Sequence, residues 1–210
     1  MDLFERKKFL DEKRELIVAK LVFYYGAMGC SKTANALMTR FQYIDKGLSV
    51  WLIKPEIDNR DNIVNIDGTI TALVKSRVGI SGEATVIKSN DRIIPPDNVD
   101  LIICDEAQFL SEFQVDELKA IAETFNIPVY CYGLRTDFKT KLFPGSKRLF
   151  ELADKISELD SICDCGSPAL INARVNATGK VLTQGAQVEI GGDEKYKPLC
   201  WKCYKEAIIK

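Results

Sequence analysis

The 210-residue sequence contains no histidine. Without histidine the protein has no Ser-His-Asp or Cys-His catalysis, so acid–base chemistry falls to carboxylates, Lys, Tyr or Cys. Any zinc site must be built from Cys, with Asp or Glu as the other available ligands. The sequence also lacks an apolar run near the roughly 20 residues that a membrane-spanning helix needs, and residues 1–14 lack an apolar signal core. We therefore expect a cytoplasmic protein with no membrane partner.

A basic excess is absent as well. Lys and Arg together number 29, Asp and Glu number 30, and the pI is near 5.7. General polyanion binders carry a basic excess, so we expect no nucleic-acid partner. The chain is 46% hydrophobic and 28% charged, which is typical of a globular protein. Its length suits one domain, or one domain with a small appendage.

Strand-like and helix-like segments alternate along most of the chain. The run LVFYY at 21–25 is typical of a buried strand, and residues 33–45 have helical periodicity. Residues 54–98 contain Asp, Asn, Gly and Pro and give only modest strand or helix signals. The alternation predicts an α/β fold with a parallel sheet flanked by helices. Together with the phosphate-binding loop described below, it is typical of the P-loop (RecA-like) class. Further strands are expected at 48–53, 99–104, 127–133 and 155–160, and further helices at 111–125, with Ser111 as N-cap, and at 145–154.

The first predicted helix has an apolar face, and the chain as a whole divides into three regions. The face comprises Ala34, Leu37, Met38, Phe41 and Ile44. The predicted regions are a charged leader at 1–18, a P-loop α/β domain at 19–160, and a zinc-ribbon-like module with a loop over the active site at 161–210. The leader is expected to be an exposed helix or a solvated segment that docks loosely on the body.

A phosphate-binding loop is the first chemical motif. The octapeptide GAMGCSKT comprises Gly26, Ala27, Met28, Gly29, Cys30, Ser31, Lys32 and Thr33. It matches G-x-x-x-x-G-K-[ST] except that Ser31 replaces the second glycine, and it joins a predicted strand to a predicted helix. Lys32 would lie at the outer phosphates of ATP, and Thr33 would reach Mg²⁺. The alternative is a strand–turn–helix junction with a chance lysine.

Two adjacent acids end the apolar strand LIIC. Asp105 is expected to hold Mg²⁺, in the manner of a Walker B motif. Glu106 stands one residue further, where a carboxylate can accept a proton from an attacking hydroxyl. The alternative is that acids often follow strands simply because strand ends meet solvent. The phosphate loop upstream favours the catalytic interpretation.

Four of the seven cysteines form two close pairs near the carboxyl terminus. Cys163 and Cys165 make the first pair, and Cys200 and Cys203 make the second. Structural zinc takes four soft ligands in tetrahedral geometry, usually from two such pairs. The alternatives are buried free thiols or a redox pair.

The order of these motifs resembles the zinc-containing (type II) thymidine kinases over about residues 20–205. The resemblance rests on GAMGCSKT, KPEIDNRD (54–61), CDEAQF (104–109), YGLRTDF (132–138) with FPGS (143–146), CDCG, and VEIGGDEKYKPLCWKCY (188–204). It implies transfer of the γ-phosphate of ATP to the 5′-hydroxyl of thymidine or deoxyuridine, with Glu106 as general base. It further implies a structural zinc on the four cysteines, a homotetramer, and inhibition by thymidine triphosphate.

The resemblance also implies which residues hold the two substrates. The ATP and Mg²⁺ site would comprise the phosphate loop, Asp58, Arg60, Asp105 and Gln108. The nucleoside site would comprise Met28, Phe109, Leu134, Phe138, Gln187, Val188, Glu189, Ile190, Gly191 and Tyr196. The stretch from Gln187 to Gly191 would read thymine largely through backbone groups.

Two other functions remain open from the sequence. One is a P-loop ATPase acting on nucleic acid, since the Asp-Glu-Ala-Gln segment resembles helicase motifs. The short chain and its slightly acidic balance oppose that function. The other is a noncatalytic zinc-ribbon adaptor in which Ser31 marks an inactive phosphate loop.

Overall fold

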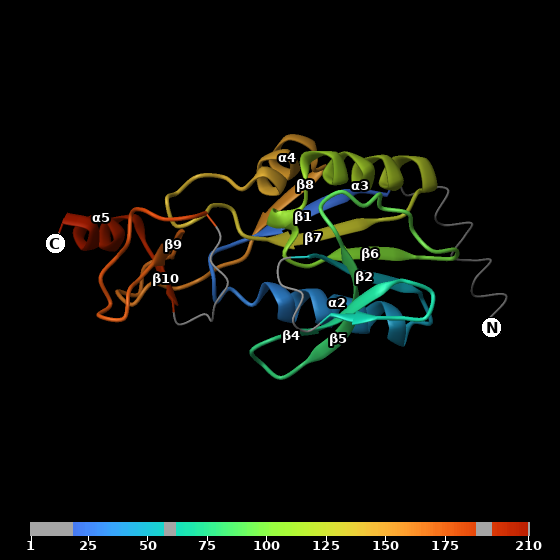
Figure 1. Cartoon of the computed structure of the whole chain (residues 1–210), viewed down its shortest axis with the longest axis horizontal. Helices are drawn as coiled ribbons and strands as arrows, with labels where there is room; N and C mark the ends of the chain where they lie inside the picture. Colours follow the sequence, from blue (N-terminus) through green and yellow to red (C-terminus); the bar gives the residue numbers. More distant parts are fainter. Residues whose placement is uncertain (1–18, 57–61, 188–194, 210) are drawn as a thin grey trace.

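The protein folds around one large sheet with a small cysteine-bearing unit at one end (Figure 1). The computed structural model describes residues 19–56, 62–187 and 195–209. The predicted leader at 1–18 lies outside these residues. The α/β prediction is confirmed. The elements of the main unit are β1 (Leu21–Tyr25), α2 (Lys32–Asp45), β2 (Val50–Pro55), β3 (Ile63–Val64), β4 (Ile70–Lys75), β5 (Ser81–Ile87), β6 (Leu101–Cys104), η1 (Ala107–Phe109), α3 (Glu112–Phe125), β7 (Val129–Gly133), α4 (Pro144–Leu152) and β8 (Lys155–Glu158).

The sheet has the strand order β3-β4-β5-β2-β6-β7-β1-β8. Every pair from β5 to β8 is parallel, and β3–β4 and β4–β5 are antiparallel. The antiparallel edge is formed by the stretch 54–98, whose sequence signals were weak. Because β1 and β6 are separated only by β7, the loop after β1 and the acids after β6 emerge at the same edge of the sheet.

Helices cover the central strands on both faces. Helix α2 packs on one face, and α3 and α4 pack on the other (Figure 1). All four residues of β6 are buried, which explains why its sequence is continuously apolar rather than alternating. Helix α3 begins with the predicted N-cap: the Ser111 hydroxyl accepts from the Gln114 N–H, and the Gln114 side chain accepts from the Ser111 N–H. This reciprocal capping box satisfies two backbone donors at the start of the helix.

The apolar face predicted for α2 is buried only in part. Ala34 and Leu37 lie in the core, but Met38, Phe41 and Ile44 are 56%, 69% and 44% exposed. The buried residues of the helix, Ala34, Ala36 and Leu37, all lie in its first half, and the apolar stripe of the later turns stays on the surface. The predicted apolar face therefore meets the core only in the first half of the helix.

A second, smaller unit lies beyond β8. Strands β9 (Ile171–Arg174) and β10 (Tyr196–Leu199) pair in antiparallel fashion, and α5 (Trp201–Ile209) packs beside β9. Its core also includes Ala27 from the phosphate loop. The boundary predicted between 160 and 161 stays a prediction, because this shared core joins the two units. None of the described helices is long and apolar enough to cross a membrane.

Candidate active site

The phosphate loop connects β1 to α2, as the motif predicted. The Lys32 ammonium donates to the carbonyl oxygens of Gly26 at 3.3 Å and Ala27 at 2.9 Å, so it lies over the loop. Gly26 has no space for a side chain, since an added Cβ would lie 2.4 Å from the Leu159 carbonyl oxygen. A positive side chain and the amino terminus of α2 together favour an anion here.

Ser31 is the departure from the motif, and it adopts left-handed backbone geometry with φ 61° and ψ 29°. A non-glycine residue in this region costs about 1–2 kcal/mol. Glycine adopts the same conformation without that penalty. The serine therefore keeps the loop conformation that the motif needs, at a cost in conformational energy.

The phosphate loop and the strand-end acids meet directly. The Thr33 hydroxyl donates to Asp105 Oδ2 at 2.9 Å, although the two residues are 72 positions apart. Burial, with a smaller effect from the Glu106 charge, raises the pKa of Asp105 to about 7. A hydroxyl and a carboxylate side by side make an all-oxygen donor set, which is the kind that Mg²⁺ prefers. The predicted Mg²⁺ residues are thus adjacent.

Glu106 is held in an unusual backbone conformation beside Asp105. Its φ is 54° and its ψ is 35°, again the left-handed region. Gln108 is fully buried; its Nε2 donates to Glu106 Oε2 at 2.5 Å and its Oε1 accepts from the Leu134 N–H at 2.9 Å. An added Cβ on Gly133 would lie 2.8 Å from Gln108 Oε1, so only glycine leaves room for this amide. Strain of this kind is often retained where a side chain must point into a site.

Gln108 was predicted as an ATP-site residue from the resemblance. Both ends of its amide contact protein groups, one on Glu106 and one on Leu134. It therefore connects the proposed general base to a residue of the predicted nucleoside pocket. Contact of Gln108 with ATP stays a prediction.

The predicted nucleoside residues fall into two groups in the structure. Phe109 and Leu134 lie on the sheet side: Phe109 packs edge-on against Phe143 at 5.4 Å, and the Leu134 carbonyl accepts from the Ser146 hydroxyl. The other group is next to β9 and comprises Phe138, Gln187 and Tyr196, which are brought together by Arg174. The predicted residues Val188, Glu189, Ile190 and Gly191, and also Asp58 and Arg60, lie outside the described residues.

Met28 belongs to the phosphate loop but is held by residues from beyond β8. Its N–H donates to Asn172 Oδ1 at 2.7 Å, and its carbonyl accepts from the Ser161 hydroxyl at 3.0 Å. The Asn172 amide also donates to the Thr136 carbonyl at 3.2 Å. Sequence analysis missed these residues because no motif marks them and Asn172 lies 144 positions from Met28.

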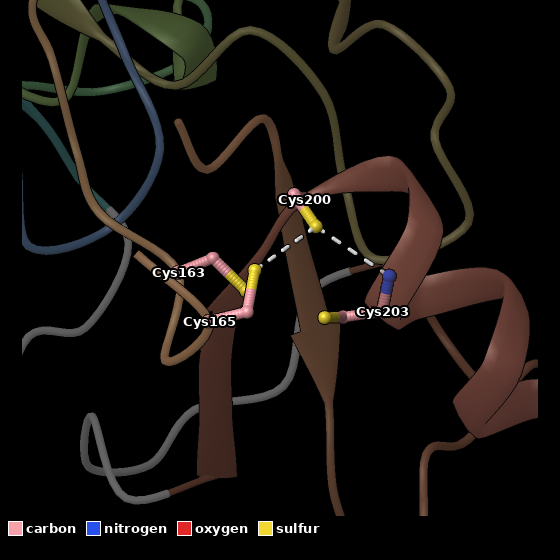
Figure 2. Close-up of side chains that lie close together, drawn as sticks. All are labelled: Cys163, Cys165, Cys200 and Cys203. Carbon is pink, nitrogen blue, oxygen red and sulfur yellow. Dashed lines mark hydrogen bonds between the residues drawn. The ribbon is translucent and has the colours of Figure 1, made fainter. Parts of the chain in front are cut away.

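The four predicted zinc ligands converge (Figure 2). All four sulfur atoms lie within 4.8 Å of one another, and the Sγ atoms of Cys165 and Cys200 are 3.6 Å apart. Sulfurs about 2.3 Å from a tetrahedral zinc lie about 3.8 Å apart. The Cys203 N–H donates to Cys200 Sγ at 3.5 Å. The donor set and its spacing fit zinc.

The thiols of this cluster differ in acidity. Hydrogen bonds from Ser167, with smaller effects from Cys203 and Cys200, lower the pKa of Cys165 to about 6. Hydrogen bonding with Cys165, then with Cys200 and Cys163, raises the pKa of Cys203 to about 12. Crowded thiols share protons unequally, and a metal ion would replace those protons.

Comparisons with known proteins identify one family. The family model described as Thymidine kinase matches residues 19–204. The chain is 40% identical over 200 residues to the thymidine kinase of Enterobacteria phage T4, covering 92% of this chain and 99% of the phage protein. It is 38% identical over 198 residues to the thymidine kinase of Shewanella oneidensis, covering 91% of this chain and 99% of that protein. The chain belongs to the thymidine kinase family.

Membership of the thymidine kinase family confirms the resemblance drawn from the motifs. It identifies the chain as a kinase and favours that class over the nucleic-acid motor and the noncatalytic adaptor. A third relative, the thymidine kinase of Yersinia pseudotuberculosis, is 40% identical over 198 residues and covers 91% of this chain and 97% of its own.

Proposed function

We propose that this chain transfers the γ-phosphate of ATP to the 5′-hydroxyl of thymidine or deoxyuridine, giving the nucleoside monophosphate. The observation that carries the proposal is the junction at the sheet edge. There Thr33 of the phosphate loop bonds to Asp105, and Asp105 is followed by Glu106 in a strained conformation. Phosphate binding, metal binding and a proton acceptor are therefore available within a few ångströms of one another.

The residues divide the reaction between positioning and proton transfer. Loop N–H groups and Lys32 hold the phosphates and offset the charge of the transferring group. Thr33 and Asp105 would hold Mg²⁺, which would supply charge neutralisation at the phosphates. Glu106 accepts the proton of the 5′-hydroxyl, and Gln108 fixes the direction of that carboxylate through its 2.5 Å bond. The predicted Asp58 and Arg60 act near the phosphates.

Thymidine binds on the side of the site that faces the cysteine unit. Its base is flat and neutral, so apolar and aromatic side chains can stack on it while backbone groups read its amide-like edge. The proposed pocket comprises Met28, Phe109, Leu134, Phe138, Tyr196 and the stretch 187–191. Zinc on the four cysteines would stabilise β9, β10 and α5, and β10 carries Tyr196.

Assembly and regulation follow the family pattern in this proposal. The chain forms a homotetramer in the cytoplasm and is inhibited by thymidine triphosphate. The exposed apolar stripe of Met38, Phe41 and Ile44 on α2 supports self-association, because such a stripe is costly in water.

The test is a direct assay with purified protein. Incubation with Mg-ATP and thymidine should yield thymidine monophosphate and an equal amount of ADP. ADP release that needs DNA or RNA instead of thymidine would replace the proposal with a nucleic-acid motor. Absence of ADP release with thymidine, with DNA and with RNA would support the noncatalytic adaptor.

A further inference from the structure

Arg174 is a buried cation that no sequence motif marks. It ends β9, and only 2% of its surface is exposed. Removing a charged side chain from water carries a large free-energy cost unless the protein supplies compensating contacts. Its described contacts are unusual, because they include backbone carbonyls, a phenol and two aromatic rings.

The hydrogen bonds of Arg174 connect the end of β9 to residues 186–187 and to β10. Its Nη1 donates to the Ala186 carbonyl at 2.9 Å and its Nη2 donates to the Gln187 carbonyl at 3.3 Å. Its Nε and Nη2 donate to the Tyr196 hydroxyl at 3.0 Å and 2.6 Å. One planar guanidinium therefore fixes both carbonyls and the phenol in a single plane of donors.

The same guanidinium stacks on an aromatic ring. Its carbon lies 3.9 Å from the centre of the Phe138 ring and 5.2 Å from the centre of the Tyr196 ring. A second bond supports this arrangement: the Gln187 side-chain amide donates to Asp137 Oδ2 at 3.1 Å. Phe138, Gln187 and Tyr196 are all proposed thymidine-binding residues, and Arg174 contacts each of them.

We propose that Arg174 is a positioning residue for thymidine, which orients the Phe138 ring, the Gln187 carbonyl and the Tyr196 ring at the nucleoside side of the site. This inference rests on the proposed thymidine kinase function. A lysine at this position would keep the charge, but it has neither the planar surface for Phe138 nor the fork of donors for three acceptors. Shape, rather than charge alone, should therefore determine thymidine affinity.

The experiment compares Arg174→Lys, Arg174→Ala and wild type in steady-state kinetics. We expect KM for thymidine to rise on the order of 10- to 100-fold in both variants, the range expected for lost charged hydrogen bonds. KM for ATP should change by less than about threefold, because the hydrogen bonds and ring contacts described above join Arg174 to residues of the nucleoside side. Millimolar methylguanidinium should restore part of the thymidine affinity of Arg174→Ala but none of that of Arg174→Lys, whose side chain fills the space.

Two controls separate positioning from folding. Arg148→Lys changes an arginine on α4 that pairs with Asp116 and Glu151, and it should leave both KM values unchanged. Tyr196→Phe removes one acceptor of Arg174. The effect on thymidine KM of combining Tyr196→Phe with Arg174→Lys should therefore be smaller than the two separate effects added together.

The outcomes are distinct. Thymidine KM within about twofold of wild type in both Arg174 variants overturns the positioning role while leaving the kinase function intact. A second result also overturns it: KM for thymidine and KM for ATP rise by the same factor, the melting temperature falls, and methylguanidinium restores neither KM. That pattern indicates a structural role. A wild-type protein that forms no thymidine monophosphate overturns the proposed function and this inference together.

Discussion

The main sheet and the cysteine unit stabilise their parts of the site by different means. Around β6 the sheet is covered by helices on both faces, and Leu101, Ile102 and Ile103 are fully buried. The unit around β9 has one short antiparallel pair, a small core and four converging thiols. Small cores of this kind usually need a metal or disulfides to hold their shape.

The difference assigns separate tasks to the two regions. The sheet fixes the groups that act on phosphate, because Lys32, Asp105 and Glu106 all lie just beyond the carboxyl ends of its strands. The cysteine unit supplies Arg174 and Tyr196, which belong to the proposed nucleoside side. We therefore expect changes in the sheet to alter chemistry and changes in the cysteine unit to alter nucleoside binding and stability.

The largest effect is expected from Glu106→Gln. Gln preserves size and hydrogen bonding but cannot accept a proton as a carboxylate does, so kcat for thymidine should fall on the order of 10²–10⁴-fold. Binding of ATP and thymidine, measured by calorimetry, should change much less, because the loss falls on the transition state. Asp105→Asn should instead raise the Mg²⁺ requirement. A Glu106→Gln protein that keeps more than about a third of kcat would contradict the role of general base.

The second effect comes from Cys200→Ser, which tests whether the small unit depends on metal. Wild-type protein should contain about one zinc per chain. The variant should lose zinc and melt at a lower temperature, because metal-binding energy is partly folding energy. Circular dichroism should still show the main sheet and its helices. Ile162→Ser, at a 72% exposed neighbour of Cys163, is the matched control. Metal-free wild-type protein with full activity would refute the zinc assignment.

The smallest effect is expected from Ser31→Gly. Because Ser31 has a positive φ, glycine should stabilise the protein by about 1 kcal/mol and change ATP affinity only modestly. Lys32→Ala is the contrasting variant and should remove most turnover, since it deletes charge at the transferring phosphate. Denaturant melts and ATP-dependent kinetics measure both. Near-normal phosphorylation by Lys32→Ala would show that the phosphate site has been misassigned.

Local patterns predicted the parts of the site that depend on neighbours in sequence. The phosphate loop, the acids after β6 and the cysteine pairs each have fixed spacing, so they could be found without a structure. Asn172 and Arg174 could not, because no fixed spacing links them to their partners and their residue types are common on surfaces. The exposure of the α2 face could not be predicted for a related reason: periodicity shows that a stripe is apolar, but only the tertiary fold shows how much of the stripe meets the sheet.

The two bonds to Met28 have a thermodynamic consequence. Asn172 and Ser161 hold a backbone segment of the ATP loop from the part of the chain that also carries the nucleoside contacts. If thymidine orders the segment that carries Asn172 and Ser161, it therefore changes the free energy of the phosphate loop in the absence of ATP. By linkage, the factor by which bound thymidine changes the Kd of ATP must equal the factor by which ATP changes the Kd of thymidine. Cooperativity between the two substrates is thus expected to pass through Met28, a residue that each of them is proposed to contact.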